Sequence, residues 1–156
     1  MINVVIQGLG YVGSATALTI ASKLGKNKKP LFNVIGIEKK NNENSKTLID
    51  KINSKIFPYK SSDVEVKSLL KKIKKFKNIS ATDDIKYFSK AHVIIISINF
   101  DFKDKNFNDF KLMSFKKSIE EIGKNITENT LLIVQSTVPP GTTEKIVLPI
   151  LKNILR

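Results

Sequence analysis

The chain has 156 residues, a length typical of one domain with its own hydrophobic core. With 41% hydrophobic and 26% charged residues, its composition is that of a globular protein and excludes a disordered chain. The absence of cysteine excludes disulfides, thiolate metal sites and a cysteine nucleophile within these residues, and with a single histidine no metal site is expected.

The net charge of +13 raises the possibility of a nucleic-acid partner. All but one of the 27 basic residues are lysine, whereas recognition of bases and phosphates relies on the forked guanidinium of arginine. A solvated lysine surface is therefore the favoured interpretation, and nucleic acid is not expected as a partner.

Residues 1–22 contain no charged side chain, which calls for a test of a signal peptide or a membrane span. A signal peptide would carry basic residues ahead of its apolar core, and a span would need about 20 mostly apolar residues. Neither pattern is present, because Asn3, Gln7 and three glycines interrupt the run. A soluble cytoplasmic protein without a membrane partner is expected.

The first third of the chain predicts a strand, a helix and a second strand. Residues 2–7 form a β-branched run that ends at a glycine, as a buried parallel strand does. Residues 14–24 are small and apolar and predict a helix that ends with Gly25 as its C-cap. A turn at 26–30 leads to an apolar strand at 32–38.

The rest of the chain continues the alternation. Amphipathic helices are predicted at 43–54 and 63–77, a short strand at 78–81, and a helix capped by Thr82 with Asp83 and Asp84 in its first turn. Further strands are predicted at 92–98 and 130–135, separated by a helix with apolar residues at helical spacing from Leu112 to Ile122. The last helix, 142–156, is expected to be kinked or shortened by Pro149.

Five strands that alternate with helices predict an α/β fold with a parallel, doubly wound sheet in three α/β/α layers. One domain is predicted to cover residues 1–156.

The sequence Gly8-Leu9-Gly10-Tyr11-Val12-Gly13 fits the pattern G-x-G-x-x-G. The pattern is weak alone, but here it follows a strand and opens a helix, the context of a Rossmann dinucleotide site. Gly8 would permit the tight turn, Gly10 would let the backbone approach a pyrophosphate, and Gly13 would allow close packing of helix on strand. The N–H groups of the helix N-terminus would bind the phosphates.

The second strand ends at Glu38, 25 residues after Gly13, close to where an acidic residue usually binds the ribose of the adenosine. This acid favours NAD, because it would repel the 2′-phosphate of NADP. Lys39 and Lys40 beside it could accommodate that phosphate, so NADP is kept as the less favoured alternative.

The segment from Ser136 to Glu144 follows the fifth strand, at the edge where open parallel sheets bind their ligands. From spacing alone, a turn stiffened by Pro139 and Pro140 is as good an interpretation as a ligand role.

Three segments resemble the NAD-binding domain of the UDP-glucose/GDP-mannose dehydrogenase family. They are the glycine motif at 8–13, Ala81-Thr82-Asp83-Asp84, and Ser136-Thr137-Val138-Pro139-Pro140-Gly141-Thr142, and together they extend over nearly the whole chain. The resemblance implies NAD as cofactor, with Gly8 to Gly13 at the pyrophosphate, Glu38 at the ribose and Thr137 near the nicotinamide. Tyr11 would approach the sugar substrate.

The resemblance also implies a two-step oxidation of a nucleotide sugar's primary alcohol to a carboxylate, through an intermediate held by a cysteine thiolate. Such an enzyme would serve polysaccharide biosynthesis and act as a homodimer. Because this chain has no cysteine, it is expected to bind cofactor but to lack activity alone, with no catalytic residue of its own and with the nucleotide sugar bound by a downstream domain. An alternative interpretation is a regulatory module that senses NAD or NADH.

Besides the absence of cysteine, the sequence departs from the family after the fourth predicted strand. Ser97-Ile98-Asn99-Phe100 stands where the family usually has a Pro-Thr-Pro type of sequence. The set of residues predicted to contact the cofactor is Gly8, Leu9, Gly10, Tyr11, Val12, Gly13, Glu38, Lys39, Ser97, Ile98, Asn99, Ser136 and Thr137.

Overall fold

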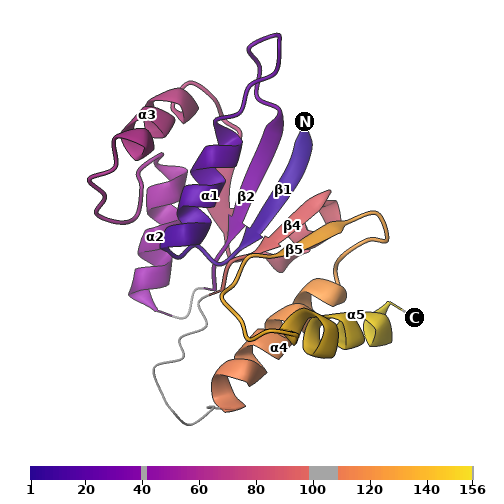
Figure 1. Cartoon of the computed structure of the whole chain (residues 1–156). Helices are drawn as coiled ribbons and strands as arrows, with labels where there is room; N and C mark the ends of the chain where they lie inside the picture. Colours follow the sequence, from indigo (N-terminus) through magenta and orange to yellow (C-terminus); the bar gives the residue numbers. More distant parts are fainter. Residues whose placement is uncertain (40–41, 99–108, 156) are drawn as a thin grey trace.

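The structure is a computed structural model that describes residues 1–39, 42–98 and 109–155, with side chains in the last range from residue 112 onward. Its centre is a five-stranded sheet in the order β3-β2-β1-β4-β5, with every neighbouring pair parallel (Figure 1). The strands are β1 Ile2–Gln7, β2 Phe32–Ile37, β3 Ile79–Thr82, β4 Val93–Ile96 and β5 Leu131–Val134. The predicted parallel sheet is confirmed.

The order of the strands reverses between β1 and β4. From β1 the chain moves outward to β2 and β3, and then crosses back to add β4 and β5 on the other side. In an open parallel sheet, this reversal opens a crevice at the carboxyl ends of the two central strands. Gln7 and Ile96, the last residues of β1 and β4, are register partners at that edge.

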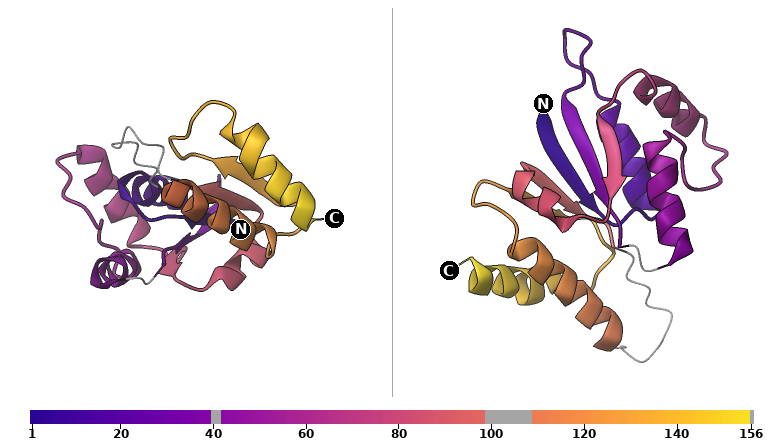
Figure 2. Two further views of the ribbon diagram at one scale, coloured as in Figure 1. Left: turned by 90° about the horizontal axis from the view of Figure 1, so that it is seen from below. Right: turned by 180° about the vertical axis from the view of Figure 1, so that it is seen from behind.

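Helices cover both faces of the sheet, which confirms the three predicted layers (Figure 2). One face carries α1 Tyr11–Ala21, α2 Glu43–Asn53 and α3 Val64–Ile73. The other carries the 3-10 helix η1 Ile85–Lys90, α4 Asp109–Gly123, the π-helical turn η2 Thr143–Val147 and α5 Leu148–Ile154.

Alternation of side chains along β1 divides the hydrophobic core in two. Ile6 packs in the cluster that includes Leu18 of α1, whereas Val5 packs in the cluster that includes Ile119 of α4. Val5, Ile6 and Ile119 are all fully buried. Because β1 is buried on both faces, a continuous apolar run rather than a polar and apolar alternation specifies it.

The first helix differs from its prediction at both ends. Helix α1 begins at Tyr11, three residues earlier than expected, with Gly10 as its N-cap. It ends at Ala21, and its C-cap is Ser22 in a right-handed conformation. Gly25 is therefore not the C-cap; it lies in the following turn, where its N–H donates to the carbonyl of Lys29 at 2.9 Å.

Two further predictions of local structure need correction. Thr82 is the last residue of β3 rather than a helix cap, and Asp84 caps the next segment by accepting from the N–H of Lys86 at 2.9 Å. That segment is a 3-10 helix, with neither acid in its first turn. Near the C-terminus, the predicted helix is divided into η2 and α5, and α5 begins one residue before Pro149, so the shortening predicted at this proline is present.

No helix in the part of the chain that the structure describes is long and apolar enough to cross a membrane.

Candidate functional site

The glycine-rich turn lies at the carboxyl edge of the sheet, between β1 and α1. Gly8 has a φ of +93°, a conformation that residues with a side chain rarely adopt. Its N–H donates to the carbonyl of Ile37 at 2.9 Å. A Cβ on Gly8 would lie 2.6 Å from the carbonyl oxygen of Ser97, and one on Gly13 would lie 2.0 Å from the carbonyl oxygen of Gly8. The tight turn and the close helix packing predicted from the motif are therefore present.

Gly10 is surrounded by open space instead. It has an ordinary φ of −58°, and, apart from its chain neighbours, no heavy atom of the described residues lies within 4 Å of the place where its Cβ would be. Neither its conformation nor its protein neighbours therefore require glycine at this position. A ligand that passes close to the backbone would require it.

The N-terminus of α1 opens onto the same space. No side chain of the described residues caps it, and its first turn holds no acidic residue. The first N–H groups of an α-helix have no partner within the helix and form the positive end of its dipole. Because these donors have no side-chain cap, they remain available to an anion.

Glu38 points into this crevice from the end of β2. Its Oε2 accepts the N–H of Leu9 at 2.7 Å, so the carboxylate is fixed against the glycine turn. The side chain of Leu9 is fully buried and packs onto the backbone at Gly36. Of the predicted contact residues, Leu9 can therefore reach a ligand only through its backbone.

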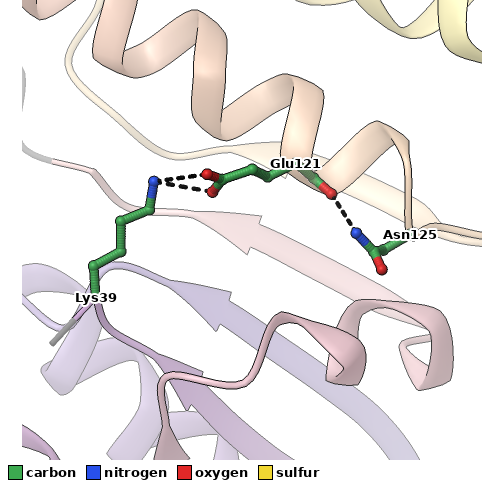
Figure 3. Close-up of polar contacts among 3 residues, drawn as sticks. All are labelled: Lys39, Glu121 and Asn125. Carbon is green, nitrogen blue, oxygen red and sulfur yellow. Dashed lines mark hydrogen bonds and ion pairs between the residues drawn. The ribbon is translucent and has the colours of Figure 1, made fainter.

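Lys39 turns to the α4 side of the sheet (Figure 3). Its Nζ contacts both carboxylate oxygens of Glu121, Oε2 at 2.9 Å and Oε1 at 3.1 Å. Lys39 was among the residues predicted from the sequence, whereas Glu121, which lies 82 residues away, was not.

Two hollows meet at Gly10, Ser97 and Ile98. The first has a volume of about 340 Å³ and includes Glu38 and Lys39. The second, of about 230 Å³, extends over the start of α1 to the end of β5. Together they are lined by ten of the predicted residues: Gly8, Gly10, Tyr11, Val12, Glu38, Lys39, Ser97, Ile98, Ser136 and Thr137.

Three predicted residues do not line the hollows. Leu9 and Gly13 are buried, and Asn99 is outside the described residues.

Ser136 has a structural contact as well, because its hydroxyl accepts the N–H of Ile98 at 3.0 Å and so joins the segments that follow β4 and β5. The segment after it forms the turn considered in the sequence analysis, in which Thr142 Oγ1 donates to the carbonyl of Pro139 at 2.7 Å.

Sequence reasoning missed an aromatic group beside the glycine turn. The hydroxyl of Tyr59 donates to the carbonyl of Leu9 at 2.9 Å, and its ring lies 5.7 Å from that of Tyr11, with Phe57 against both. Burial, with a smaller contribution from the charge of Glu38, raises the pKa of the Tyr59 hydroxyl, so it stays a hydrogen-bond donor. Phe57 and Tyr59 lie in the segment between α2 and α3, which has no periodic pattern of apolar residues. The sequence therefore did not indicate them as site residues.

Polar residues in the first hollow were also missed. Gln7 is only 5% exposed, and its Oε1 meets no donor among the described residues. Ser114 and Ser118 of α4 line the same hollow. The signal for Gln7 was present, because it is a polar residue at the end of an otherwise apolar strand.

No group of three or more histidine, acidic or cysteine residues suited to a metal ion occurs among the residues that the structure describes. A glycine turn, an uncapped helix N-terminus and an acid at the end of β2, at the reversal of a parallel sheet, together define a Rossmann-type dinucleotide-binding domain.

Comparison with known proteins specifies the family. Residues 2–155 match the UDP-glucose/GDP-mannose dehydrogenase family, NAD binding domain. The chain therefore belongs to this family, and its cofactor is NAD.

Individual relatives agree with this assignment. The UDP-glucose 6-dehydrogenase of Campylobacter jejuni is 35% identical over 92% of this chain and 33% of its own length. Protein CapL of Staphylococcus aureus is 30% identical over 97% of this chain and 30% of its own length. The crystal structure of GDP-mannose dehydrogenase from Pseudomonas aeruginosa, a ternary complex, superposes with a TM-score of 0.76 at 27% identity, covering 97% of this chain and 32% of that one. The chain spans about a third of the length of these relatives.

Proposed function

We propose that the residues lining the two hollows bind NAD in an extended conformation along the carboxyl edge of the sheet. The hollow at Glu38 would receive the adenosine, and one carboxylate oxygen of Glu38 would accept a ribose hydroxyl while Oε2 keeps the N–H of Leu9. The uncapped N-terminus of α1 would bind the pyrophosphate. The hollow lined by Val12, Ser136 and Thr137 would receive the nicotinamide.

The observation that carries this proposal is the open space at Gly10. Gly8 and Gly13 are explained by contacts within the protein, whereas no contact with a described residue explains Gly10, and a ligand at its Cα would. Its position at the N-cap of α1, where both hollows meet, is where a pyrophosphate would join the two halves of the cofactor.

For the reaction, we propose the oxidation of a nucleotide sugar's primary alcohol to a carboxylate, supported by family membership and by the names of the relatives. NAD, when bound, accepts a hydride in each oxidation. The described residues would orient the cofactor and keep its phosphates in place. They would not oxidise the sugar alone, because the family's cysteine nucleophile has no counterpart in a chain without cysteine.

Calorimetric titration of the chain with NAD tests the proposal, with Gly10→Ala as the critical variant. We expect the wild type to bind NAD and Gly10→Ala to bind at least about tenfold more weakly, because a methyl group would occupy the space of the pyrophosphate. Gly25→Ala makes the same change in the turn before β2, away from both hollows, and should bind NAD like the wild type.

Absence of NAD binding by the folded wild type at millimolar concentration would contradict the cofactor site. Equal NAD affinity in the wild type and Gly10→Ala would contradict the assigned position of the pyrophosphate. For the reaction, mixing the chain with NAD and UDP-glucose should produce no NADH, and NADH formation in proportion to the protein added would contradict the proposed need for a cysteine.

A further inference from the structure

The ion pair between Lys39 and Glu121 joins two elements on different sides of the crevice. Lys39 directly follows Glu38 at the end of β2, whereas Glu121 lies in α4, on the face of the sheet opposite α1. Both carboxylate oxygens of Glu121 contact the ammonium group, at 2.9 and 3.1 Å. The side chains are 35% and 24% exposed, so the pair is partly shielded from water.

This pair determines which charges surround the first hollow. Glu38 and Lys39 both line it, but the positive charge of Lys39 is neutralised by Glu121, while the negative charge of Glu38 faces a backbone N–H. Of these three charged residues, only Glu38 has no partner of opposite charge. The hollow therefore carries a negative charge where the ribose of an adenosine would lie.

The ribose 2′ position is the only chemical difference between NAD and NADP. A 2′-hydroxyl can donate to Glu38, whereas a 2′-phosphate carries negative charge and needs a nearby cation. Lys39 is the cation closest in sequence to Glu38 among the described residues, and its positive charge is already balanced by Glu121.

We propose that Glu121 is a specificity-determining residue that disfavours NADP by holding Lys39 in an ion pair. The inference rests on the proposed placement of the adenosine in the hollow at Glu38. Glu121 itself does not line that hollow, so it acts through Lys39 rather than by contact with the cofactor.

The test is Glu121→Gln, which keeps the shape of the side chain and removes its charge. We expect the ratio of NADP to NAD affinity to rise by about tenfold, the size that one charge-assisted hydrogen bond supports. The affinity for NAD itself should change little, because a 2′-hydroxyl needs no cation. Calorimetric titration with each dinucleotide measures both affinities.

Two further variants separate this mechanism from a general effect of charge. Glu120→Gln removes the same charge from the neighbouring, exposed position of α4, and should leave the ratio unchanged. Lys39→Met added to Glu121→Gln should abolish the gain in NADP affinity, because the released ammonium group is what binds the phosphate.

An unchanged ratio in Glu121→Gln, with NAD still bound, would overturn the inference and leave the proposed function intact. An equal rise in Glu120→Gln, or a gain that persists after Lys39→Met, would overturn it as well, because the effect would then not pass through Lys39. A folded wild type that binds neither dinucleotide would overturn the proposed function and this inference together.

Discussion

At Gly13, an added Cβ atom would lie 2.0 Å from the carbonyl oxygen of Gly8, whereas at Gly10 it would meet no atom of the described residues within 4 Å. The two glycines of one motif therefore serve different purposes. Gly13 lets α1 start directly beside the turn, so it belongs to the fold. Gly10 leaves the helix N-terminus accessible, so we assign it to the proposed cofactor site.

We expect Gly13→Ala to lower the free energy of unfolding by at least about 3 kcal/mol, at or beyond the upper end of overpacking effects, because a backbone carbonyl cannot move aside as a side chain does. Gly10→Ala should stay within about 1 kcal/mol of the wild type. Urea denaturation followed by circular dichroism measures both. Similar losses in the two variants would contradict the difference in packing.

Residues of the candidate site differ in how well the sequence predicts them. The glycine motif and Glu38 could be proposed from the sequence because each lies at a fixed offset from the end of a strand. Tyr59 was not found, since its importance comes from a neighbour distant in the chain. Tyr59 contacts a carbonyl 50 residues away, and no spacing within its own segment indicates that.

Among the elements, the turn between α1 and β2 includes a residue in an unfavourable conformation. Lys28 has a φ of +58°, in the left-handed region that residues with a Cβ avoid. Its N–H donates to the carbonyl of Gly25 at 2.9 Å, and an isolated bridge between Leu24 and Pro30 closes the turn. The hydrogen bonds of the turn thus hold Lys28 in a conformation that glycine adopts at a lower energy.

Lys28→Gly should raise the free energy of unfolding by about 0.5–1 kcal/mol, because the left-handed penalty of about 1–2 kcal/mol exceeds the entropic cost of glycine. Lys26→Gly, which removes the same charge from the same turn where no positive φ is found, should lower stability slightly. Thermal unfolding of both variants measures the difference. A loss of stability in Lys28→Gly would show that the strain is not relieved.

Helix boundaries were the least predictable part of the elements. The apolar pattern at 14–24 indicated a helix but not its start, because α1 begins inside the glycine motif at Tyr11. The start there depends on Gly13 fitting against Gly8, which is a packing contact. The strands were easier, since an apolar run bounded by turn residues marks a strand that is buried on both faces.

At the scale of the whole molecule, the net charge of +13 is the dominant feature of the surface. Only the ion pair of Lys39 with Glu121 is found among the described residues, so most of the lysines are not neutralised by direct contact. Like charges at this density repel one another in the folded state, and dissolved salt screens that repulsion.

We expect the melting temperature to rise when the salt concentration increases from low to physiological ionic strength. A gain of about 1 kcal/mol would correspond to about 2–4 °C for a chain of this size. Sodium chloride is the suitable salt, because sulfate also strengthens hydrophobic burial. A melting temperature that falls with sodium chloride would indicate that attractive ion pairs outweigh the repulsion between lysines.

The sequence by itself determined the fold class, the order of the elements and the glycine turn with its acid, because each is encoded by local spacing and by the burial pattern of single segments. The tertiary structure alone decided the helix that begins at Tyr11, the contact of Tyr59 with the turn and the pairing of Lys39 with Glu121. These depend on how α4 and the segment after α2 pack against the sheet. Packing brings together residues 50 and 82 positions apart, which no periodicity within one segment records.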